Sequence, residues 1–419
     1  MFDLVTLCKK AKNAWFFLNK LSENDKNKAL ILCAKRLREQ RDFLMSENAI
    51  DIQNARQKGM SDAFIDRLNL SEKVIEGMAV GLEQVAELES PLGKVVYSYD
   101  NVEQGIFIEK KTVPFGVVGI IYESRPNVTA DAFALCFKTS NAVILKGGSD
   151  SLRSNVAIVK VLRSALIECG IDEFCVSVIE DTSRETTTAF MKMNKYVDLL
   201  IPRGSASLIR SALENSTIPI IETGTGNCHV FVDESANVDM AAQVIFNAKT
   251  QRYSVCNACE SLVIHKAVLS RALPEIAKLL QTKQVEIRAD EQAKKVIPNY
   301  PYLKDATSDD FYTEYGSAII SVKTVDNIDQ AISHINEHGT RHSESIITEN
   351  AENAQKFLNE IDSSSVYHNA STRFTDGFVF GLGAEIGIST QKLHARGPMG
   401  LSALVTTKYV IVGNGAVRK

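Results

Sequence analysis

Apolar residues recur at helical spacing over about the first 90 residues of the chain. Ala29, Cys33 and Leu37 repeat at four-residue intervals behind a start at Ser22 and Asp25 that resembles a capping box. Side chains four positions apart lie on one face of a helix, and an N-cap serine accepts an amide of the first turn. The pattern predicts a layer of helices that packs on something else and carries no chemistry.

The helical pattern breaks at Pro91-Leu92-Gly93, and two strand-like runs follow it. They cover residues 95–99 and 105–111 and are joined at Asp100-Asn101, a dipeptide typical of turns. We expect a hairpin that projects between the helical layer and the next part of the chain.

From Val113 onward, near-continuous apolar runs alternate with helical ones. Strands buried on both faces have this composition, and strands that alternate with helices form parallel sheets. The predicted strands are 117–121, 142–145, 176–179, 197–201 and 218–221, with helices at 131–138, 154–169 and 205–213. A second set starts near Val230, with helices at 238–249, 267–281, 326–337 and 351–360, and strands at 261–265, 317–322, 343–348, from Val366 and at 404–412. The chain is therefore expected to form α/β domains with parallel sheets.

Chain length and composition narrow the class of protein. A chain of 419 residues is too long for one ordinary core, so two large domains are expected. The formal net charge of −4 gives no electrostatic reason to expect nucleic acid as a partner. No apolar run approaches membrane-spanning length, and the N-terminus has no signal-peptide pattern. The eight cysteines follow no disulfide spacing, so we expect reduced thiols and a cytoplasmic protein.

Cys256 is the candidate nucleophile. It lies between a helix-like run at 239–249 and the strand at 261–265, on a turn that would hold a thiol rigid yet reachable. Backbone N–H groups of a turn can lower a thiol pKa or receive an oxyanion. Cys256 and Cys259 also form a C-x-x-C pair, typical of a zinc half-site or a redox pair, but no second pair lies at zinc spacing. No metal is expected, and a small core cysteine is the alternative reading of Cys256.

Two loops that follow predicted strands are candidate nucleotide sites. One is Lys146-Gly147-Gly148-Ser149, and the other is Arg203-Gly204-Ser205, which opens a helix. Loops at the carboxyl ends of parallel strands present backbone N–H groups to phosphates. Neither loop matches G-x-G-x-x-G, and a plain strand-to-helix turn explains either about as well. Ser149 instead of a carboxylate, with Lys146 as counter-ion, favours NADP over NAD.

Two further groups of residues could act on a substrate. Glu222, in a glycine-rich stretch between the domains, could serve as a base, although such a stretch is also common as a plain connection. Arg373, Lys392 and Arg396 lie among glycines near the C-terminus. Guanidinium groups bind carboxylate and phosphate through forked hydrogen bonds, so this cluster suits an anionic substrate. A solvated basic loop explains any single member equally well.

Several of these stretches together resemble a known family. They are the Cys256 turn, the Lys146 loop, residues 113–128 and the long run at 369–400. With the order of elements, they resemble the aldehyde dehydrogenase superfamily over essentially the whole chain, and most closely the branch that reduces L-glutamyl 5-phosphate.

The resemblance implies an aldehyde dehydrogenase-like fold of two Rossmann-like parallel-sheet α/β domains plus a small β oligomerisation flap. The NADP-binding domain would be 1–93 and 112–225, the catalytic domain 226–399, and the flap 94–111 and 400–419. The chain departs from the family pattern at Tyr253, where proline is expected, and at Cys259, where an aliphatic residue is expected.

The resemblance also implies the reaction, the second step of proline biosynthesis from glutamate. Cys256 would attack L-glutamyl 5-phosphate to form a thioester, which NADPH would reduce to glutamate 5-semialdehyde. Asn127 would donate to the oxyanion, and Glu314 would hold the nicotinamide ribose. Glu222 occupies the position of the general base in hydrolytic relatives and is placed with the cofactor-binding residues here.

The same resemblance implies partners. In this superfamily the flap strands pair between subunits, so a homodimer or larger homo-oligomer is expected. Glutamyl phosphate is labile, so contact with a separate glutamate 5-kinase is a further hypothesis. Two other classes stay open: a hydrolytic or CoA-acylating aldehyde dehydrogenase, which would not require phosphate, and a non-catalytic scaffold, which would not require Cys256.

Overall fold

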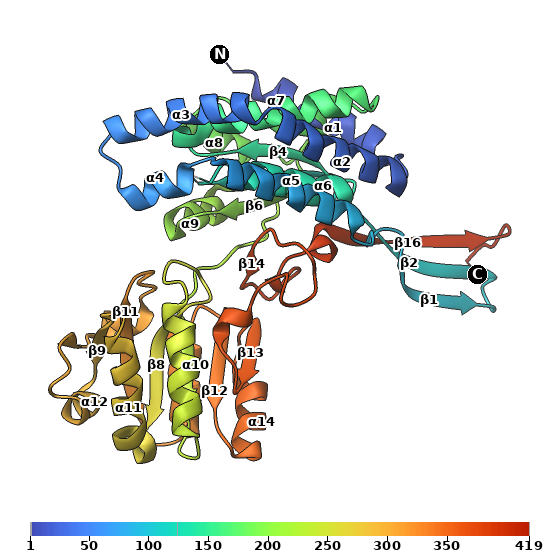
Figure 1. Ribbon diagram of the computed structural model, residues 1–419. Coiled ribbons are helices and arrows are strands. Elements are labelled where there is room, and N and C mark those ends of the chain that lie inside the picture. Colours follow the sequence, from blue (N-terminus) through green and yellow to red (C-terminus); the bar gives the residue numbers. More distant parts are fainter. Residues whose placement is uncertain (1, 124, 419) are drawn as a thin grey trace. The chain divides into compact units, whose positions relative to one another are not determined.

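A computed structural model describes residues 2–123 and 125–418 of the chain (Figure 1). The chain forms two compact units. Unit 1 comprises Met1–Glu222, Leu382–Gly387 and Met399–Lys419, and unit 2 comprises Thr223–Gly381 and Ile388–Pro398. Each unit has its own parallel sheet, as the alternation of apolar runs and helices predicts.

The predicted N-terminal helical layer lies within unit 1. Its helices are α1 (Leu4–Leu18), α2 (Glu23–Glu39), α3 (Arg41–Gln57), α4 (Asp62–Leu68) and α5 (Glu72–Glu87). Ser22 caps α2 by accepting the Asp25 amide, as its position in the sequence indicates. Helix α1 packs directly on the sheet, whereas α2, α3 and α5 pack against other helices of the unit.

The sheet of unit 1 has the order β5-β4-β3-β6, with all strands parallel. The strands are β3 (Val117–Tyr122), β4 (Ala142–Lys146), β5 (Val176–Val178) and β6 (Leu199–Arg203), and the helices are α6 (Val128–Lys138), α7 (Leu152–Glu168), α8 (Arg184–Phe190) and α9 (Ala206–Asn215). The strand predicted at 218–221 is wrong: only a single bridge, Leu200 to Ile220, forms. Pro219 has no N–H to donate to a ladder, which explains why no regular strand forms there.

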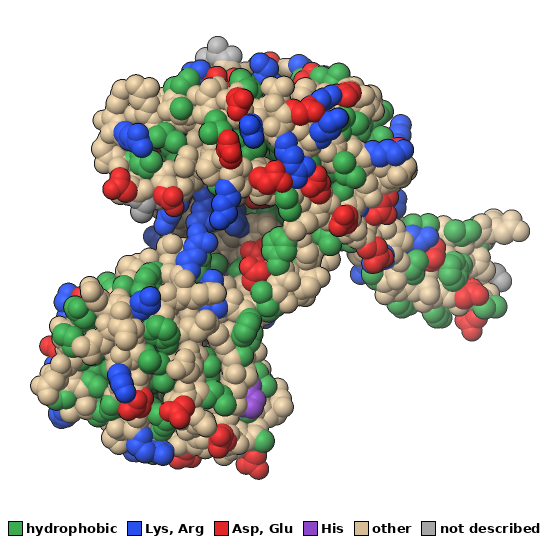
Figure 2. Space-filling view, in the orientation of Figure 1, with side chains coloured by type: hydrophobic (Ala, Val, Ile, Leu, Met, Phe, Trp, Pro, Cys, Tyr) green, Lys and Arg blue, Asp and Glu red, His purple; other side chains and the backbone are tan. Residues whose placement is uncertain are grey.

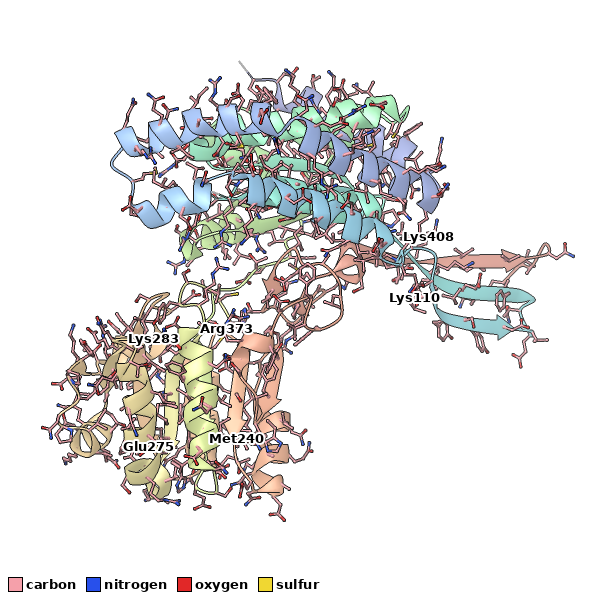
Figure 3. The ribbon with its side chains drawn as sticks, viewed as in Figure 1. Lys110, Met240, Glu275, Lys283, Arg373 and Lys408 are labelled. Carbon is pink, nitrogen blue, oxygen red and sulfur yellow. The ribbon has the colours of Figure 1, made fainter. Side chains whose placement is uncertain are left out.

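A separate three-stranded antiparallel sheet of unit 1 contains β1 (Val95–Asn101), β2 (Ile106–Pro114) and β16 (Val405–Gly413), in the order β1-β2-β16 (Figure 1). The hairpin is longer than predicted, and its turn falls at 102–105 instead of 100–101. The C-terminal strand finds its partner within the chain, since β16 pairs with β2 along its whole length. Adjacent strands carry Lys110 and Lys408, which Figure 3 labels.

Unit 2 contains a seven-stranded parallel sheet in the order β10-β9-β11-β8-β7-β12-β13. The strands are β7 (Cys228–Val232), β8 (Cys259–His265), β9 (Glu286–Ala289), β10 (Leu303–Asp305), β11 (Ile319–Val325), β12 (Ser343–Ile347) and β13 (Ser365–His368). The helices are α10 (Val238–Thr250), α11 (Lys266–Gln281), α12 (Glu291–Val296), α13 (Ile328–His338) and α14 (Ala351–Glu360). Short strands β14 (Ile388–Ser389) and β15 (Gly397–Pro398) form a separate pair. The central strands β7, β8 and β12 are buried along their full length. They bury polar side chains as well, among them Glu260 and Glu344, which an apolar pattern does not predict.

Candidate active site

The turn that carries Cys256 joins the end of α10 to the start of β8, as predicted from the sequence. Cys256 is partly exposed, whereas Cys259 opens β8 and is fully buried. Burial raises the pKa of the Cys259 thiol to about 12, so Cys259 stays protonated and unreactive at neutral pH. The two members of the C-x-x-C pair therefore differ in chemistry, and only Cys256 is placed to meet a substrate.

The segment that leads into β7 packs against the backbone of Cys256. A Cβ atom built on Gly226 would lie 1.5 Å from the Cys256 carbonyl oxygen, so only glycine fits this position. The Cys228 thiol donates to the same oxygen at 3.1 Å. Both contacts fix the peptide of Cys256, the candidate nucleophile, and the sequence pattern did not indicate either of them.

Asn257 anchors the other side of the turn. Its Nδ2 donates to the Thr375 carbonyl oxygen at 2.9 Å, and its own carbonyl oxygen accepts from the Thr372 hydroxyl at 2.7 Å. Both threonines lie at or next to a short 3-10 helix, η4 (Thr372–Phe374). The late run of the sequence therefore packs directly on the nucleophile turn.

Arg373 lies in that 3-10 helix and reaches the same turn. Its Nε donates to Gln251 Oε1 at 2.8 Å, just beyond the C-terminal end of α10, and Figure 3 labels it there. Burial lowers the pKa of Arg373, and a negative charge on Cys256 would act in the opposite direction. Of the three predicted anion-binding residues, Arg373 is the one that the structure brings to Cys256.

Lys392 and Arg396 have a different partner. Lys392 Nζ lies 2.8 Å from Asp362 Oδ2, and Arg396 Nη2 lies 2.9 Å from Asp362 Oδ1. Both cations hold the pKa of Asp362 below its usual value. A substrate anion would compete with this carboxylate for both side chains, although each keeps further N–H donors.

Glu314 lies on the loop between the 3-10 helix η3 (Ser308–Tyr312) and β11. Burial raises its pKa, while a hydrogen bond from the Gly226 backbone N–H and the Lys249 ammonium oppose that rise. Glu314 and Cys256 are thus linked through Gly226, which contacts both. A carboxylate so placed can accept hydrogen bonds from hydroxyl groups of a ligand next to the nucleophile.

The predicted nucleotide loops lie at one edge of the unit 1 sheet. Lys146 ends β4 and Arg203 ends β6, and β3 lies between these strands in register with both. Lys146 is 5% exposed, and its Nζ donates to the Gly147 carbonyl oxygen at 3.2 Å. A Cβ on Gly147 would meet Asn155 Nδ2 at 2.1 Å, so packing within the unit requires this glycine.

A cavity of about 240 Å³ opens beside Ser149. It is lined by Asp51, Asn54, Gln57, Lys58, Ser149 and Asp150. Lys58 Nζ lies 2.7 Å from Asp150 Oδ1, so a cation at the C-terminal end of α3 lies next to the predicted nucleotide loop. This cation was missed from the sequence because nothing local indicates that α3 meets this loop.

The second loop has an unpredicted acidic neighbour, Glu123. The loop opens α9 as predicted, with Ser205 as the N-cap, but the Ser205 backbone N–H and hydroxyl donate to Glu123 at 2.9 and 2.8 Å. A Cβ on Gly204 would lie 2.7 Å from the same carboxylate. Glu123 takes the hydrogen bonds that a phosphate at this helix terminus would need, so phosphate binding there requires Glu123 to move.

Asn127 precedes the first residue of α6 but makes no capping hydrogen bond with its side chain, which instead donates from Nδ2 to Asp131 Oδ2 at 3.2 Å. Burial raises the pKa of Asp131 to about 6, and Asn127 and Arg203 oppose the rise. Nδ2 carries two hydrogens, so this bond fixes the amide and leaves it able to donate a second time. Ser124, inside the family-like run, lies outside the described residues.

Glu222 is the last residue of its segment of unit 1 and is partly buried. It does not end a regular strand, because only single bridges at Ile220 and Thr223 flank it. Within residues 2–123 and 125–418, no cluster of His, Cys, Asp and Glu is arranged to hold a metal ion. The same part of the chain contains no helix both long and apolar enough to cross a membrane.

Comparison with known proteins identifies the class. The aldehyde dehydrogenase family matches residues 3–296 and 305–408. A probable aldehyde dehydrogenase from Listeria monocytogenes has a similar crystal structure, with a TM-score of 0.70, 15% identity and coverage of 99% of this chain and 96% of that chain. The chain therefore belongs to the aldehyde dehydrogenase family, and its predicted fold class is confirmed.

More similar relatives share one name. A gamma-glutamyl phosphate reductase from Caldicellulosiruptor bescii is 53% identical over 420 residues and covers 100% of both chains. One from Lachnospira eligens is 55% identical over 414 residues, or 98% of each chain. The crystal structure of gamma-glutamyl phosphate reductase from Thermotoga maritima matches with a TM-score of 0.97 and 46% identity over 100% of both chains.

Proposed function

We propose that the chain catalyses NADPH-dependent reduction of L-glutamyl 5-phosphate to L-glutamate 5-semialdehyde and phosphate, a step of proline biosynthesis. The observation that carries this proposal is the Cys256 turn, which holds a partly exposed thiol and packs on the 3-10 helix that carries the Arg373 guanidinium. A fixed, reachable thiol beside a cation is the arrangement that thiolate chemistry on an anionic substrate needs. Relatives of the same name match over the full length of the chain.

The reaction proceeds through a covalent intermediate on Cys256. The thiolate attacks the acyl carbon, the bond from that carbon to the phosphate oxygen breaks, and phosphate leaves with the bonding electrons. When bound, NADPH supplies the hydride that reduces the thioester. The carbon–sulfur bond then breaks, the aldehyde leaves, and Cys256 returns to its thiolate form. The Cys256 backbone N–H is our donor for the developing oxyanion, and Asn127 remains the predicted side-chain donor.

The residues of unit 1 fit a dinucleotide that carries a 2′-phosphate. Ser149 presents a hydroxyl instead of a carboxylate, and Lys58 lines the same cavity, where it pairs with Asp150. A 2′-phosphate there would compete with the Asp150 carboxylate for Lys58, and Lys146, which lies shortly before Ser149 in the sequence, offers a second cation. Glu314 of unit 2 is assigned to the nicotinamide ribose, because its carboxylate can accept from hydroxyl groups. We assign Arg373 to binding of the anionic substrate. Lys392 and Arg396 could contribute in competition with Asp362, with which both are paired.

Reverse-direction kinetics test this function. The purified protein should reduce NADP with glutamate semialdehyde only when phosphate is present, and more slowly with NAD. The Cys256→Ala variant should lose this activity, while Cys259→Ala should retain most of it. Phosphate-independent turnover would instead indicate a hydrolytic aldehyde dehydrogenase with Glu222 as its base. Absence of turnover in the unmodified protein would favour a scaffold.

The flap suits self-association. Strands β1 and β16 are its outer strands, and large apolar side chains on it are exposed, as Figure 2 shows. They include Val96, Tyr97, Tyr99, Tyr409, Ile411 and Val412. Exposed apolar strands at a sheet edge favour pairing with another chain, and we infer a homodimer or larger homo-oligomer.

Two further assignments follow from the reaction. A biosynthetic enzyme that uses NADPH and a labile acyl phosphate is expected in the cytoplasm. Contact with a glutamate 5-kinase would shorten the exposure of that intermediate to water. Co-sedimentation of the two proteins at micromolar concentration tests the contact, and independent sedimentation would rule it out.

A further inference from the structure

Both ends of the nucleophile turn meet in a buried ion pair. Lys249 lies in the last turn of α10, and Glu260 is the second residue of β8. Both side chains have no exposed surface, and Lys249 Nζ lies 2.6 Å from Glu260 Oε2. Removing two charges from water costs free energy that their attraction often fails to return, and apolar residues of similar volume are frequently as stable. Stability alone therefore does not explain this pair.

The second oxygen of Glu260 has a separate partner. Its Oε1 accepts from the Gly316 backbone N–H at 3.2 Å, two residues after Glu314. Glu260 thus bridges the nucleophile turn to the loop that carries Glu314. The same loop is tied to the turn a second time, since Glu314 accepts from the Gly226 backbone N–H and Gly226 lies directly against Cys256.

Lys249 acts on both carboxylates. Burial raises the pKa of Glu260 to about 7, and Lys249 is the largest cause that opposes this rise. Lys249 also opposes the rise in the pKa of Glu314. Without this ammonium, two buried carboxylates would raise each other's pKa, and one of them would take up a proton. A protonated Glu314 would be a weaker acceptor for ligand hydroxyls.

We propose that Lys249 and Glu260 are positioning residues that hold the Cys256 turn and the Glu314 loop in one fixed arrangement. The pair contacts neither the substrate nor the cofactor directly in this scheme. It acts by fixing where the nucleophile lies relative to the carboxylate that we assign to the nicotinamide ribose. The inference rests on the proposed function for its kinetic consequences, but its structural consequences are independent of the reaction.

A double variant separates positioning from stability. Lys249→Met with Glu260→Leu removes both charges together and leaves an apolar pair, so the protein should still fold. Each single variant leaves one buried charge without its partner and should unfold at a lower urea concentration than the double variant. The matched control is Lys266→Met with Asp326→Leu, which removes an exposed ion pair of 2.7 Å from the same unit.

Two measurements on the folded double variant test the proposal. The first is hydrogen–deuterium exchange of peptides covering 250–258 and 313–318, which should become at least tenfold faster than in the control. The second is kinetics, in which KM for NADPH should rise and kcat should fall, each by at least tenfold. Unchanged exchange in both peptides, with KM and kcat within threefold of the control, would overturn the proposal.

The two proposals fail in distinguishable ways. If the unmodified protein lacks phosphate-dependent turnover, the proposed function is wrong, and the exchange experiment still decides whether the ion pair orders the two segments. If the unmodified protein turns over normally and the double variant matches the control, only the positioning role is wrong. Should the double variant fail to fold, Glu260→Gln offers a second test, because its amide oxygen can still accept from Gly316 while the charge is lost. Normal exchange at 313–318 together with an unchanged KM for NADPH in Glu260→Gln would then refute the need for the ion pair.

Discussion

Gly226→Ala should disable the enzyme by displacing the nucleophile. The added Cβ would lie 1.5 Å from the Cys256 carbonyl oxygen, 2.3 Å from its carbonyl carbon and 2.7 Å from its Cα. These are backbone atoms, so no side-chain rotation relieves the clash. Ordinary van der Waals contact begins near 3.4 Å, and the difference of 3.4 − 1.5 = 1.9 Å is the distance that the turn or the glycine segment must move.

The size of the effect follows from that displacement. A misplacement of roughly 1 Å in a reacting group costs on the order of 100-fold in rate. We therefore expect kcat/KM of Gly226→Ala to fall at least about 100-fold, or about 2.7 kcal/mol of transition-state stabilisation. Forcing one methyl group into a packed region also lowers the free energy of unfolding by about 1–3 kcal/mol.

The assay is steady-state kinetics beside urea unfolding, with Gly77→Ala as the matched control. Gly77 lies inside α5, and a Cβ there would meet nothing within 4 Å. The control should keep its activity and gain about 1 kcal/mol of stability from the better helix propensity of alanine. A folded Gly226→Ala protein with kcat/KM within threefold of the unmodified enzyme would refute the reasoning.

Two further predictions concern stability and assembly. His342 is fully buried, and burial lowers its pKa from 6.5 to about 4. The unfolded chain takes up this proton first as pH falls, so the stability present above about pH 6.5 should decline towards pH 4 by up to about 3 kcal/mol. The urea midpoints at pH 7.5 and pH 5 should differ less in His342→Gln than in the unmodified protein. An equal difference in the two proteins would contradict this account. Ile411, 59% exposed on the flap, should be needed for assembly. Ile411→Glu should lower the sedimenting mass, whereas an unchanged mass would place the subunit contact elsewhere.

Elements with strong local signals could be predicted from the sequence. Helix α10 and strand β8 were located within two residues, because apolar periodicity and a long apolar run specify each of them. Strands β9 and β10 and helix α12 were missed, since they have three to six residues each and are buried only in part. Short elements are decided by their neighbours in the sheet, which local sequence does not reveal.

The candidate site divides in the same way. The turn at Cys256 is local, so helix, turn and strand signals place it. Its supports are distant: Cys228 lies 28 residues away from Cys256, and Thr375 lies 118 residues from Asn257. Asp362 likewise accepts a hydrogen bond from Arg396, 34 residues away. Its carboxylate competes with a substrate for the basic cluster that the sequence predicts as an anion site. Partners of this kind follow from the packed fold and not from spacing along the chain.

The pairing of β16 with β2 has a consequence for synthesis of the chain. Strand β2 ends at Pro114 and β16 begins at Val405, which is 405 − 114 = 291 positions later, and all of unit 2 lies in between. At about 5–20 residues per second, translation needs roughly 15–60 s to reach the second strand. During this interval the β1–β2 hairpin has one edge without its final neighbour. Newly made chains therefore complete the flap last, and the proposed association of subunits through the complete flap would follow the emergence of both units.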